Sequence, residues 1–335
     1  MASTTPRVSA GARSLPELVR NSSQTQRALF ALIALSIYNA FATTNFLTFA
    51  TLRVNLTQVA TIVIVGVGMT YVIGSAGIDL SVGALMAISG ALAPKIFDSQ
   101  RALLSNEWIG IPLAIVIPIL VAGAFGYFNG YLITKFKIQP IIATLVLFLG
   151  GRGIAKALSD GNLVEFNKPH FDYLGTGRPF GIPVQVIVMI VIAIVAAWGL
   201  RSTTFGRYVL AIGGNERAAE LAGVPVTRVK RQIYVLSGLL AGVAGLIVVA
   251  INTSSDPYQV GQDMELDAIA AVAVGGTPFT GGRATIAGTV IGAFFIHQVR
   301  YTLISHGVPD GTTRMVIAGA ILIAVLLQRP KAGWR

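Results

Sequence analysis

The chain has 335 residues, of which 54% are hydrophobic and 12% are charged, and it contains no cysteine. Soluble domains carry about 25% charged residues, so this composition excludes an ordinary soluble domain and indicates a chain that lies mostly in lipid. The absence of cysteine excludes a disulfide-stabilised secreted scaffold and a cysteine-ligated zinc finger. The net charge of +11 would favour nucleic acid as the partner of a soluble protein. In a membrane protein this charge reflects which loops stay in the cytoplasm, so we expect no nucleic-acid partner.

Ten apolar stretches predict an all-α polytopic membrane protein with about ten transmembrane helices, because roughly 20 apolar residues cross a bilayer. Three stretches carry polar or flexible residues near membrane depth: the third at Asp79, the fifth at Arg152 and the eighth in the glycine-rich 275–282 segment. We expect a transmembrane domain over 28–328, an arm of residues 1–27 and a tail of residues 329–335. The predicted spans are 28–45, 57–74, 79–97, 109–133, 139–157, 183–200, 232–251, 266–280, 284–305 and 314–328.

The distribution of Lys and Arg predicts the orientation, because loops rich in these residues stay in the cytoplasm. The arm holds four Arg and one Glu, and the loop at 201–231 holds six cations and two Glu. The 252–267 segment, in contrast, holds four carboxylates and no cation. Ten spans with both termini in the cytoplasm fit these charges.

Glycine pairs spaced four residues apart lie on one helix face and let a neighbouring backbone approach closely. Such pairs serve either simple bundle packing or sliding contacts between helices that move. A second pattern is that an acidic residue opens a run of small residues at Asp79 and again at Asp267, which is consistent with two repeats of five helices each. The glycine pairs are Gly126 with Gly130, Gly238 with Gly242, and Gly288 with Gly292.

Two carboxylates at membrane depth are informative because an ionised group there survives only when it is paired or wetted. Asp79 either caps the third span by accepting free N–H groups or faces a polar pathway. Asp267 lies either on a solvated periplasmic rim or on the same pathway. The uncharged Asn55, Gln58, Asn129 and Gln139 serve either interhelical hydrogen bonds or the passage of a hydroxyl-rich solute. The candidate solute path is therefore Asn55, Gln58, Asp79, Asn129, Gln139 and Asp267.

The loop at 201–231 contains the signals of a short capped helix. Asn215 is a good N-cap, Gly223 a good left-handed stop, and Pro225 prevents the helix from continuing, so we expect a two-turn helix over 216–222. A helix of this length is unstable alone in water. Its small apolar face is therefore covered either by the inner rim of the protein itself or by a groove in a cytosolic subunit.

The same loop carries a resemblance to a known family. Ala218 and Ala219, followed by three residues and Gly223, resemble the coupling-helix signature of bacterial ATP-binding-cassette (ABC) importer permeases, although Arg217 stands where many of these have Glu. From about residue 50 onward, the motifs at 77–83, 138–140, 205–207 and 213–216 resemble the permeases of ribose-type sugar importers. The motifs at 151–153, 164–167 and 265–269 are most similar to galactofuranose importer permeases.

This resemblance implies a permease subunit of the bacterial inner membrane that carries a monosaccharide such as galactofuranose or ribose. It also implies a second permease, identical or similar, two cytosolic ATP-binding subunits and a periplasmic sugar-binding protein. No phosphate-binding Gly-x-x-x-x-Gly-Lys-Ser/Thr loop occurs in the sequence, so ATP and Mg would be bound by the partner, and we expect no enzymatic activity and no cofactor in this chain. The implied docking residues are Asn215, Glu216, Arg217, Ala218, Ala219, Glu220, Leu221, Ala222 and Gly223.

Two other classes of protein compete with this interpretation. In an ion-coupled secondary transporter, Asp79 or Asp267 would titrate, but such a protein does not need the capped helix. An intramembrane enzyme would need a catalytic pair or a metal site, and only His170, His297 and His306 offer imidazoles. No span carries paired catalytic groups at helical spacing, so an enzyme is disfavoured.

Overall fold

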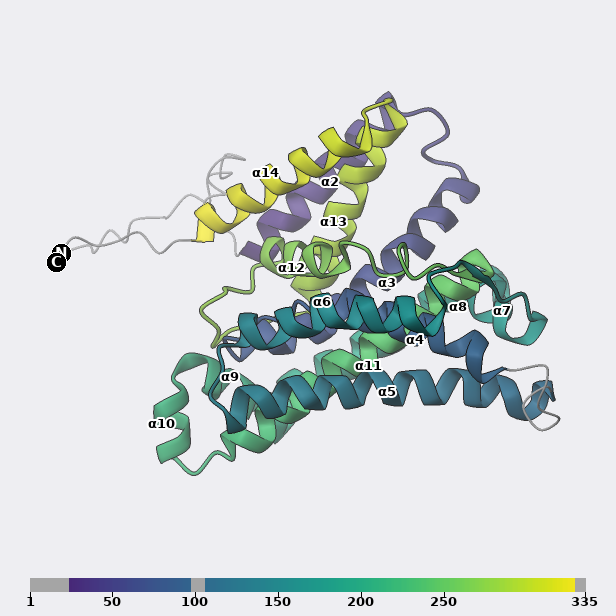
Figure 1. The fold of residues 1–335 in the computed structure, drawn as a ribbon. Helices are drawn as coiled ribbons and strands as arrows, with labels where there is room; N and C mark the ends of the chain where they lie inside the picture. Colours follow the sequence, from purple (N-terminus) through teal and green to yellow (C-terminus); the bar gives the residue numbers. More distant parts are fainter. Residues whose placement is uncertain (1–23, 98–105, 329–335) are drawn as a thin grey trace, which may run out of the picture.

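The computed structural model describes residues 24–97 and 106–328, and over these residues the chain is almost entirely helical (Figure 1). Its only sheet in this part pairs two short antiparallel strands, β1 (Val164–Glu165) and β2 (Ser254–Ser255). The predicted tail and all but the last four residues of the predicted arm lie outside the described residues. The all-α class is therefore confirmed for the described part.

Five helices in the described part are long and apolar enough to cross a membrane: α3 (Phe49–Gly74), α5 (Glu107–Lys135), α6 (Pro140–Leu158), α8 (Val184–Ser202) and α11 (Val226–Asn252). The other five predicted spans also coincide with helices, so helix positions were predicted well, while a total of ten crossings stays a prediction. These helices are α2 (Gln24–Ala42), α4 (Val82–Ile96), α12 (Met264–Val274), α13 (Ile286–Ser305) and α14 (Asp310–Gln328).

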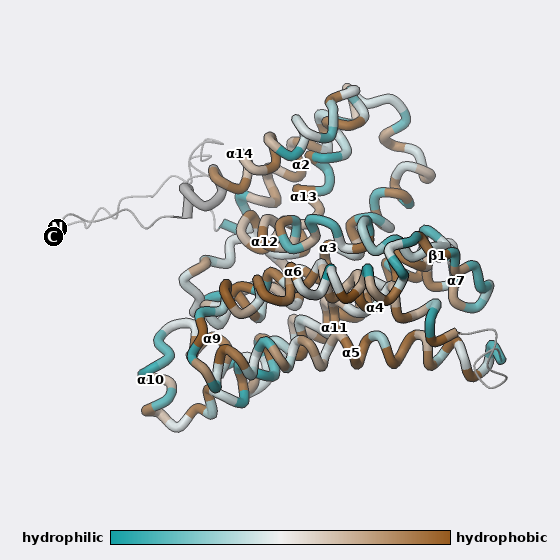
Figure 2. The backbone as a smooth tube through the Cα atoms, viewed as in Figure 1, coloured by the Kyte–Doolittle hydropathy of each residue, from teal (hydrophilic) through white to brown (hydrophobic). Residues whose placement is uncertain are grey.

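The helices form two groups that share a central core. In Figure 1, α4, α5, α6 and α11 lie together below, α2, α13 and α14 lie above, and α3 and α12 lie between them. The second half of α3 and nearly all of α4 are buried. Hydrophobic residues also line the outer helices α5 and α6, whereas α10 is largely hydrophilic (Figure 2). Exposed apolar faces on long helices are expected where the surrounding solvent is lipid.

Facing glycines allow α5 and α11 to pack in close contact. A Cβ on Gly126 would collide with the Tyr234 carbonyl oxygen, and one on Gly238 would collide with the Ala122 carbonyl oxygen. The predicted close approach is therefore confirmed for this helix pair. The same is true of α12 and α13, where side chains on Gly288 and Gly292 would collide with the backbone of Gly275 and Ala271.

Two predicted spans are shorter than expected. α4 begins at Val82 instead of 79, and α12 ends at Val274 instead of 280. The α12 prediction was wrong because Gly275 and Gly276 follow, and Gly276 has a φ of 95° that no helix accommodates. With 11 residues, α12 is about 16 Å long, roughly half of the hydrocarbon thickness. The fifth predicted span, in contrast, is one uninterrupted helix that continues through Arg152.

The connecting segments gather at two ends of the body. The α10 end holds α9 (Thr204–Gly214) and α10 (Glu216–Leu221), and the start of α2 and the last turns of α14 point the same way (Figure 1). The opposite end, called the strand end, holds β1, β2, α7 (Pro169–Thr176) and the short 3-10 helix η1 (Pro179–Gly181). This arrangement agrees with the prediction that successive loops lie on alternate sides of the membrane. Which end faces the cytoplasm stays a prediction.

Candidate functional site

The short helix α10 has the local structure that its sequence predicts. The Asn215 side-chain oxygen accepts a hydrogen bond from the Ala218 N–H at 2.9 Å, which satisfies a free donor of the first turn. Gly223 has a φ of 82°, the left-handed conformation that ends helices. α10 ends at Leu221, one residue before the predicted end, and after Pro225 the chain starts α11.

The apolar face of α10 is covered only in part by the protein itself. Ala219 is 6% exposed and packs on the bundle, while Leu221 is 76% exposed. Ala218 and Ala222 are exposed as well. The inner rim of the protein thus accounts for one of the four apolar residues of the predicted face. An exposed Leu flanked by small residues is suited to insertion into a groove of another protein.

Ion pairs fix the orientation of α10. Lys230 on α11 contacts Glu216 with an Nζ–Oε2 distance of 2.6 Å, and the Lys230 side chain is largely buried. Arg217 and Glu220 form an exposed pair at 3.0 Å along the helix surface. Because the Lys230 pair joins two helices and one partner is shielded from water, it holds α10 against the start of α11.

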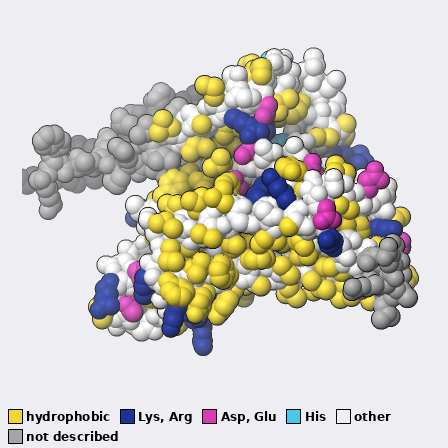
Figure 3. Space-filling model, viewed as in Figure 1, with side chains coloured by type: hydrophobic (Ala, Val, Ile, Leu, Met, Phe, Trp, Pro, Cys, Tyr) yellow, Lys and Arg dark blue, Asp and Glu magenta, His cyan; other side chains and the backbone are white. Residues whose placement is uncertain are grey.

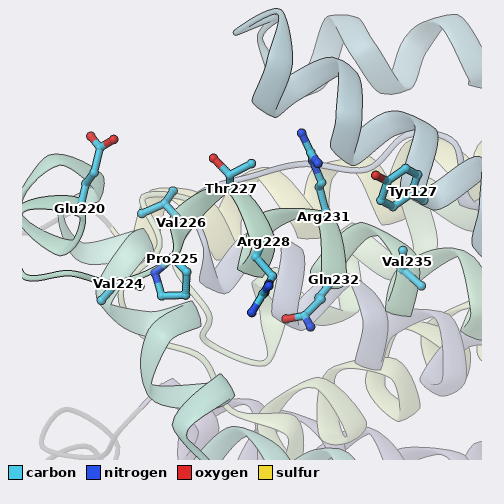
Figure 4. A pocket seen from close by; sticks show the side chains of 10 residues that line it. All are labelled: Tyr127, Glu220, Val224, Pro225, Val226, Thr227, Arg228, Arg231, Gln232 and Val235. Carbon is cyan, nitrogen blue, oxygen red and sulfur yellow. The ribbon is translucent and has the colours of Figure 1, made fainter.

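A hollow of about 750 Å³ adjoins α10 and follows the first turns of α11 (Figure 4). Figure 4 shows Glu220 at one end and Tyr127 at the other, with Arg228 and Arg231 between them on α11, where their side chains extend in different directions. Arg231 donates a hydrogen bond to Thr134 at 2.9 Å and lies over Tyr127 and Tyr131. The α10 end therefore presents a concave surface with charged groups beside the exposed Leu221.

The segment before α10 is tightly joined to the bundle. A side chain on Gly213, at the end of α9, would collide with the Gly74 carbonyl oxygen at the end of α3. The same carbonyl accepts a hydrogen bond from the Gly282 N–H at 3.0 Å. The end of α9 and the segment after α12 thus both contact the backbone at the end of α3. The helix α9, which leads directly into α10, is therefore packed against both α3 and the loop that follows α12.

Asp79 belongs to a buried polar cluster that connects three helices. Its Oδ1 accepts hydrogen bonds from the Ser81 N–H at 3.0 Å and the Ser81 hydroxyl at 2.6 Å. Its Oδ2 accepts from the Ser237 hydroxyl on α11 at 2.7 Å, and Asn129 on α5 donates to Ser81 at 2.9 Å. The prediction that Asp79 is the N-cap was wrong in position, because α4 starts only at Val82. The carboxylate nevertheless accepts an N–H group next to the helix start.

Asp267 is buried and does not lie on a solvated rim, so that alternative was wrong. Arg300 on α13 donates two hydrogen bonds to the Asp267 carboxylate, at 2.8 and 2.9 Å. A paired geometry of this kind offsets the cost of removing both charges from water. The sequence alone did not identify Arg300 as the partner of Asp267, because a partner 33 positions away leaves no local signal.

The remaining candidates for the solute path lie apart from this cluster. Asn55 on α3 contacts His297 on α13 at 2.9 Å, beside a pocket of about 310 Å³. Gln58 is exposed on α3, and Gln139 precedes α6 near Glu216 in a second small pocket at the α10 end. Of the six predicted residues, only Asp79 and Asn129 share one cluster. Within the described ranges, no group of three His, Cys, Asp or Glu side chains is placed to hold a metal ion.

Comparisons with known proteins place this chain among membrane permeases. Residues 51–326 match the family described as branched-chain amino acid transport system / permease component. The chain is 38% identical over 310 residues to the ribose import permease protein of Escherichia coli (strain K12), covering 91% of this chain and 94% of that protein. It is 42% identical over 280 residues to the ribose import permease protein of Bacillus subtilis (strain 168), covering 83% and 84%.

A third relative is named for a different sugar. The chain is 36% identical over 274 residues to the galactofuranose transporter permease protein of Escherichia coli (strain K12), covering 82% of this chain and 78% of that protein. No solved structure matches the chain. The resemblance to ribose-type permeases that the motifs indicated is therefore confirmed, and the five apolar helices agree with a multi-pass membrane protein.

Proposed function

Because this chain belongs to the branched-chain amino acid transport system / permease component family, we propose that it is the permease subunit of a monosaccharide importer driven by ATP hydrolysis in partner subunits. The sugar class is supported by the relatives, which are named as permeases for ribose and galactofuranose. The chain itself would bind neither ATP nor Mg. Its contribution is a membrane passage that changes shape when the partners act.

The observation that carries this proposal is the uncovered apolar face of α10. Leu221 projects from a capped, ion-paired helix and is 76% exposed, beside a hollow lined partly by Glu220 and Arg228. A helix presented in this way fits the groove of a cytosolic ATP-binding subunit. In this arrangement the α10 end faces the cytoplasm of a bacterial cell, and the chain lies in the inner membrane.

The packing around Gly213 supplies a route for coupling. When the ATP-binding subunits close on ATP, they would move α10, and the contact of Gly213 with Gly74 would pass that movement to α3 and to the segment after α12. Tightly packed elements of this kind shift as units and do not deform gradually. Transport would then follow from alternation between outward-open and inward-open arrangements.

Two further partners complete the proposed importer. A periplasmic sugar-binding protein would dock at the strand end and deliver the solute. A second permease, either another copy of this chain or a similar one, would pair with it in the membrane. Galactofuranose and ribose are the first candidates for the solute, because relatives named for both sugars match most of this chain.

The experiment is reconstitution of the whole transporter. The permease would be purified with the ATP-binding subunits that accompany it and placed in liposomes with the periplasmic binding protein. Uptake of radiolabelled ribose, galactofuranose, fructose and arabinose would then be measured with and without ATP. Uptake of one sugar that requires ATP supports the proposal. Uptake driven by a proton or sodium gradient without nucleotide would instead identify an ion-coupled transporter and contradict it.

A further inference from the structure

Two short helices begin close to each other in the middle of the protein. Gly83 lies in the first turn of α4 and Glu265 in the first turn of α12. A Cβ on Gly83 would collide with both Glu265 Oε2 and the Gly261 carbonyl oxygen. The helix starts are preceded by non-helical backbone, with a φ of 58° at Asp263 and 60° at Ala76. In membrane transporters, non-helical backbone at membrane depth is found where it lines a solute passage, and short helices that start next to each other place it there.

A carboxylate oxygen at this junction lacks a hydrogen-bond partner. Glu265 is only 4% exposed, and its Oε2 accepts no hydrogen bond from any residue that the structure describes. Burying an unpaired carboxylate oxygen costs free energy, so packing alone does not explain why a Glu occupies position 265. Arg152 on α6 interacts with it electrostatically, and Arg152 Nη2 lies 3.4 Å from the point where Gly83 would carry its Cβ.

Arg152 is held in place but still has N–H groups to offer. Its Nη1 donates to the Val260 carbonyl at 2.6 Å and to the Pro257 carbonyl at 3.4 Å. The side chain is not fully buried. A guanidinium has five N–H donors, so a group fixed through Nη1 can donate from its other nitrogens to a molecule that reaches it. A positioned donor of this kind in the middle of an apolar helix indicates a functional site.

The surrounding charges extend this junction into a band. Asp267 pairs with Arg300, and Asp263 pairs with Arg314 on α14. Figure 3 shows charged side chains of both signs gathered across one face of the molecule, between areas that are largely hydrophobic. We define the charged band as Arg152, Asp263, Glu265, Asp267, Arg300 and Arg314.

The composition of the band indicates the class of solute. The three Arg and three carboxylates of the band balance, and the exposed Asp310 that also pairs with Arg314 lies at its edge, so the band itself would not select a cation or an anion by its overall field. Closely spaced donors and acceptors instead match vicinal hydroxyl groups, which both donate and accept. We propose that the charged band lines the solute path and that Arg152 contacts the hydroxyls of a neutral monosaccharide there. This inference rests on the proposed function and adds to it a specificity-determining residue.

Water access provides the first test, and the absence of cysteine in the chain makes single-cysteine variants straightforward. Arg152→Cys and Leu266→Cys would be prepared in the complete transporter and treated with a water-soluble methanethiosulfonate reagent in the nucleotide-free and ATP-bound states. Leu266 is 53% exposed on α12 and serves if the Arg152 variant does not fold. Val195→Cys on α8 is the control. Val195 is 59% exposed and lies among other exposed apolar residues of this helix, so we expect it to contact only lipid.

We expect the reagent to label positions 152 and 266 in at least one nucleotide state and to leave position 195 unlabelled. The inference fails if position 152 of the band and the adjoining position 266 both stay unlabelled in both states, or if position 195 reacts equally fast. These outcomes do not depend on which sugar is carried. If wild type imports no sugar while the band is labelled, the proposed function fails, and with it the solute assigned to Arg152.

Uptake then distinguishes a solute contact from a structural role. Arg152→Gln should lose most uptake of the transported sugar, and Arg152→Lys should keep a part of it. Both should change the ratio of uptake between that sugar and its monodeoxy analogues, because the contact involves particular hydroxyls. Lys156→Gln, one turn further along α6 and placed over the Tyr258 ring, should leave this ratio unchanged. An unchanged ratio in both Arg152 variants would show that Arg152 does not contact solute.

Discussion

Asp267 on α12 and Arg300 on α13 are joined by two hydrogen bonds of 2.8 and 2.9 Å between their carboxylate and guanidinium groups. The Asp267 side chain is 9% exposed and that of Arg300 is 30% exposed. This pair ties the half-length helix α12 to a long neighbour. Because each charge neutralises the other away from water, the two residues should behave as one unit when either is changed.

Asp267→Asn should therefore destabilise the protein by about 3 kcal/mol, because it leaves the Arg300 guanidinium without its charged partner. The free energy of unfolding in detergent would measure this loss. Asp310→Asn is the matched control, since Asp310 pairs with Arg314 on an exposed surface, and it should have little effect. Equal losses of unfolding free energy in the two variants would show that the contribution of the Asp267–Arg300 pair does not depend on its burial.

The Asp79 cluster leads to a second prediction. Ser237→Ala removes the hydroxyl that donates to Asp79 Oδ2 across the contact between α11 and the start of α4. Losing this bond to a fully buried carboxylate should cost about 1–3 kcal/mol in unfolding free energy. Ser305→Ala removes an exposed hydroxyl at the end of α13 and should cost far less. A Ser237 variant as stable as wild type would show that water or another group replaces the hydroxyl.

Helix packing is tested by adding one methyl group to a glycine. Gly126→Ala would bring a Cβ into the Tyr234 carbonyl oxygen on α11, and relieving this collision should cost about 1–3 kcal/mol. Gly150→Ala on α6 meets no atom within 4 Å and should be neutral or slightly stabilising. Thermal unfolding of both variants would check the difference. A Gly126 variant with normal stability would mean that α5 and α11 separate easily.

Local signals explain why some elements were predicted closely. Asn215, Gly223 and Pro225 act within a few residues of α10, so its start was predicted correctly and its end within one residue. Long apolar stretches similarly predict the central helices, because membrane thickness fixes their length. The helix α9 (Thr204–Gly214) was missed because it lies inside the cation-rich 201–231 segment, which was interpreted as one polar loop.

Tertiary pairing explains what the sequence could not provide. Asp267 and Arg300 come from different helices, and only their packing shows that they form a pair. The same holds for Arg152, whose bonds to the Val260 and Pro257 carbonyls depend on where the 254–263 segment runs. Sequence reasoning identified Asn55, Gln58 and Gln139 as polar residues that serve either interhelical hydrogen bonds or a solute path, but it could not show that the three lie apart from one another or that Asn55 contacts His297 on another helix.

The docking surface on α10 is tested by a charge on its exposed face. Leu221→Asp should leave the isolated permease folded, because Leu221 is 76% exposed, but should abolish its co-purification with the ATP-binding subunits. ATP-dependent sugar uptake should be lost with it. Leu163→Asp, at an exposed Leu near β1 at the strand end, is the control and should assemble normally. Normal assembly of the Leu221 variant would place the docking surface elsewhere.

The strand end offers a prediction that depends on pH. Asp172 in α7 is largely buried, and its Oδ1 has no hydrogen-bond partner among the described residues. Burial raises the pKa of Asp172 above its ordinary value of 3.8, and the backbone of Lys168 offsets only part of this effect. The folded state therefore binds this proton more tightly than the unfolded state, so the charged carboxylate lowers stability at neutral pH.

Asp172→Asn removes that charge while preserving the shape of the side chain. The variant should be more stable than wild type at pH 7, and its advantage should shrink as the pH falls through the raised pKa and vanish below 3.8, where the wild-type carboxyl is protonated in both states. Unfolding temperatures across this pH range would measure the difference. Asp160→Asn, in the exposed turn before β1, should change stability much less. A contrary result would be an Asp172 variant that is less stable than wild type at pH 7. It would show that favourable interactions of the charged Asp172 carboxylate outweigh the cost of burying that carboxylate.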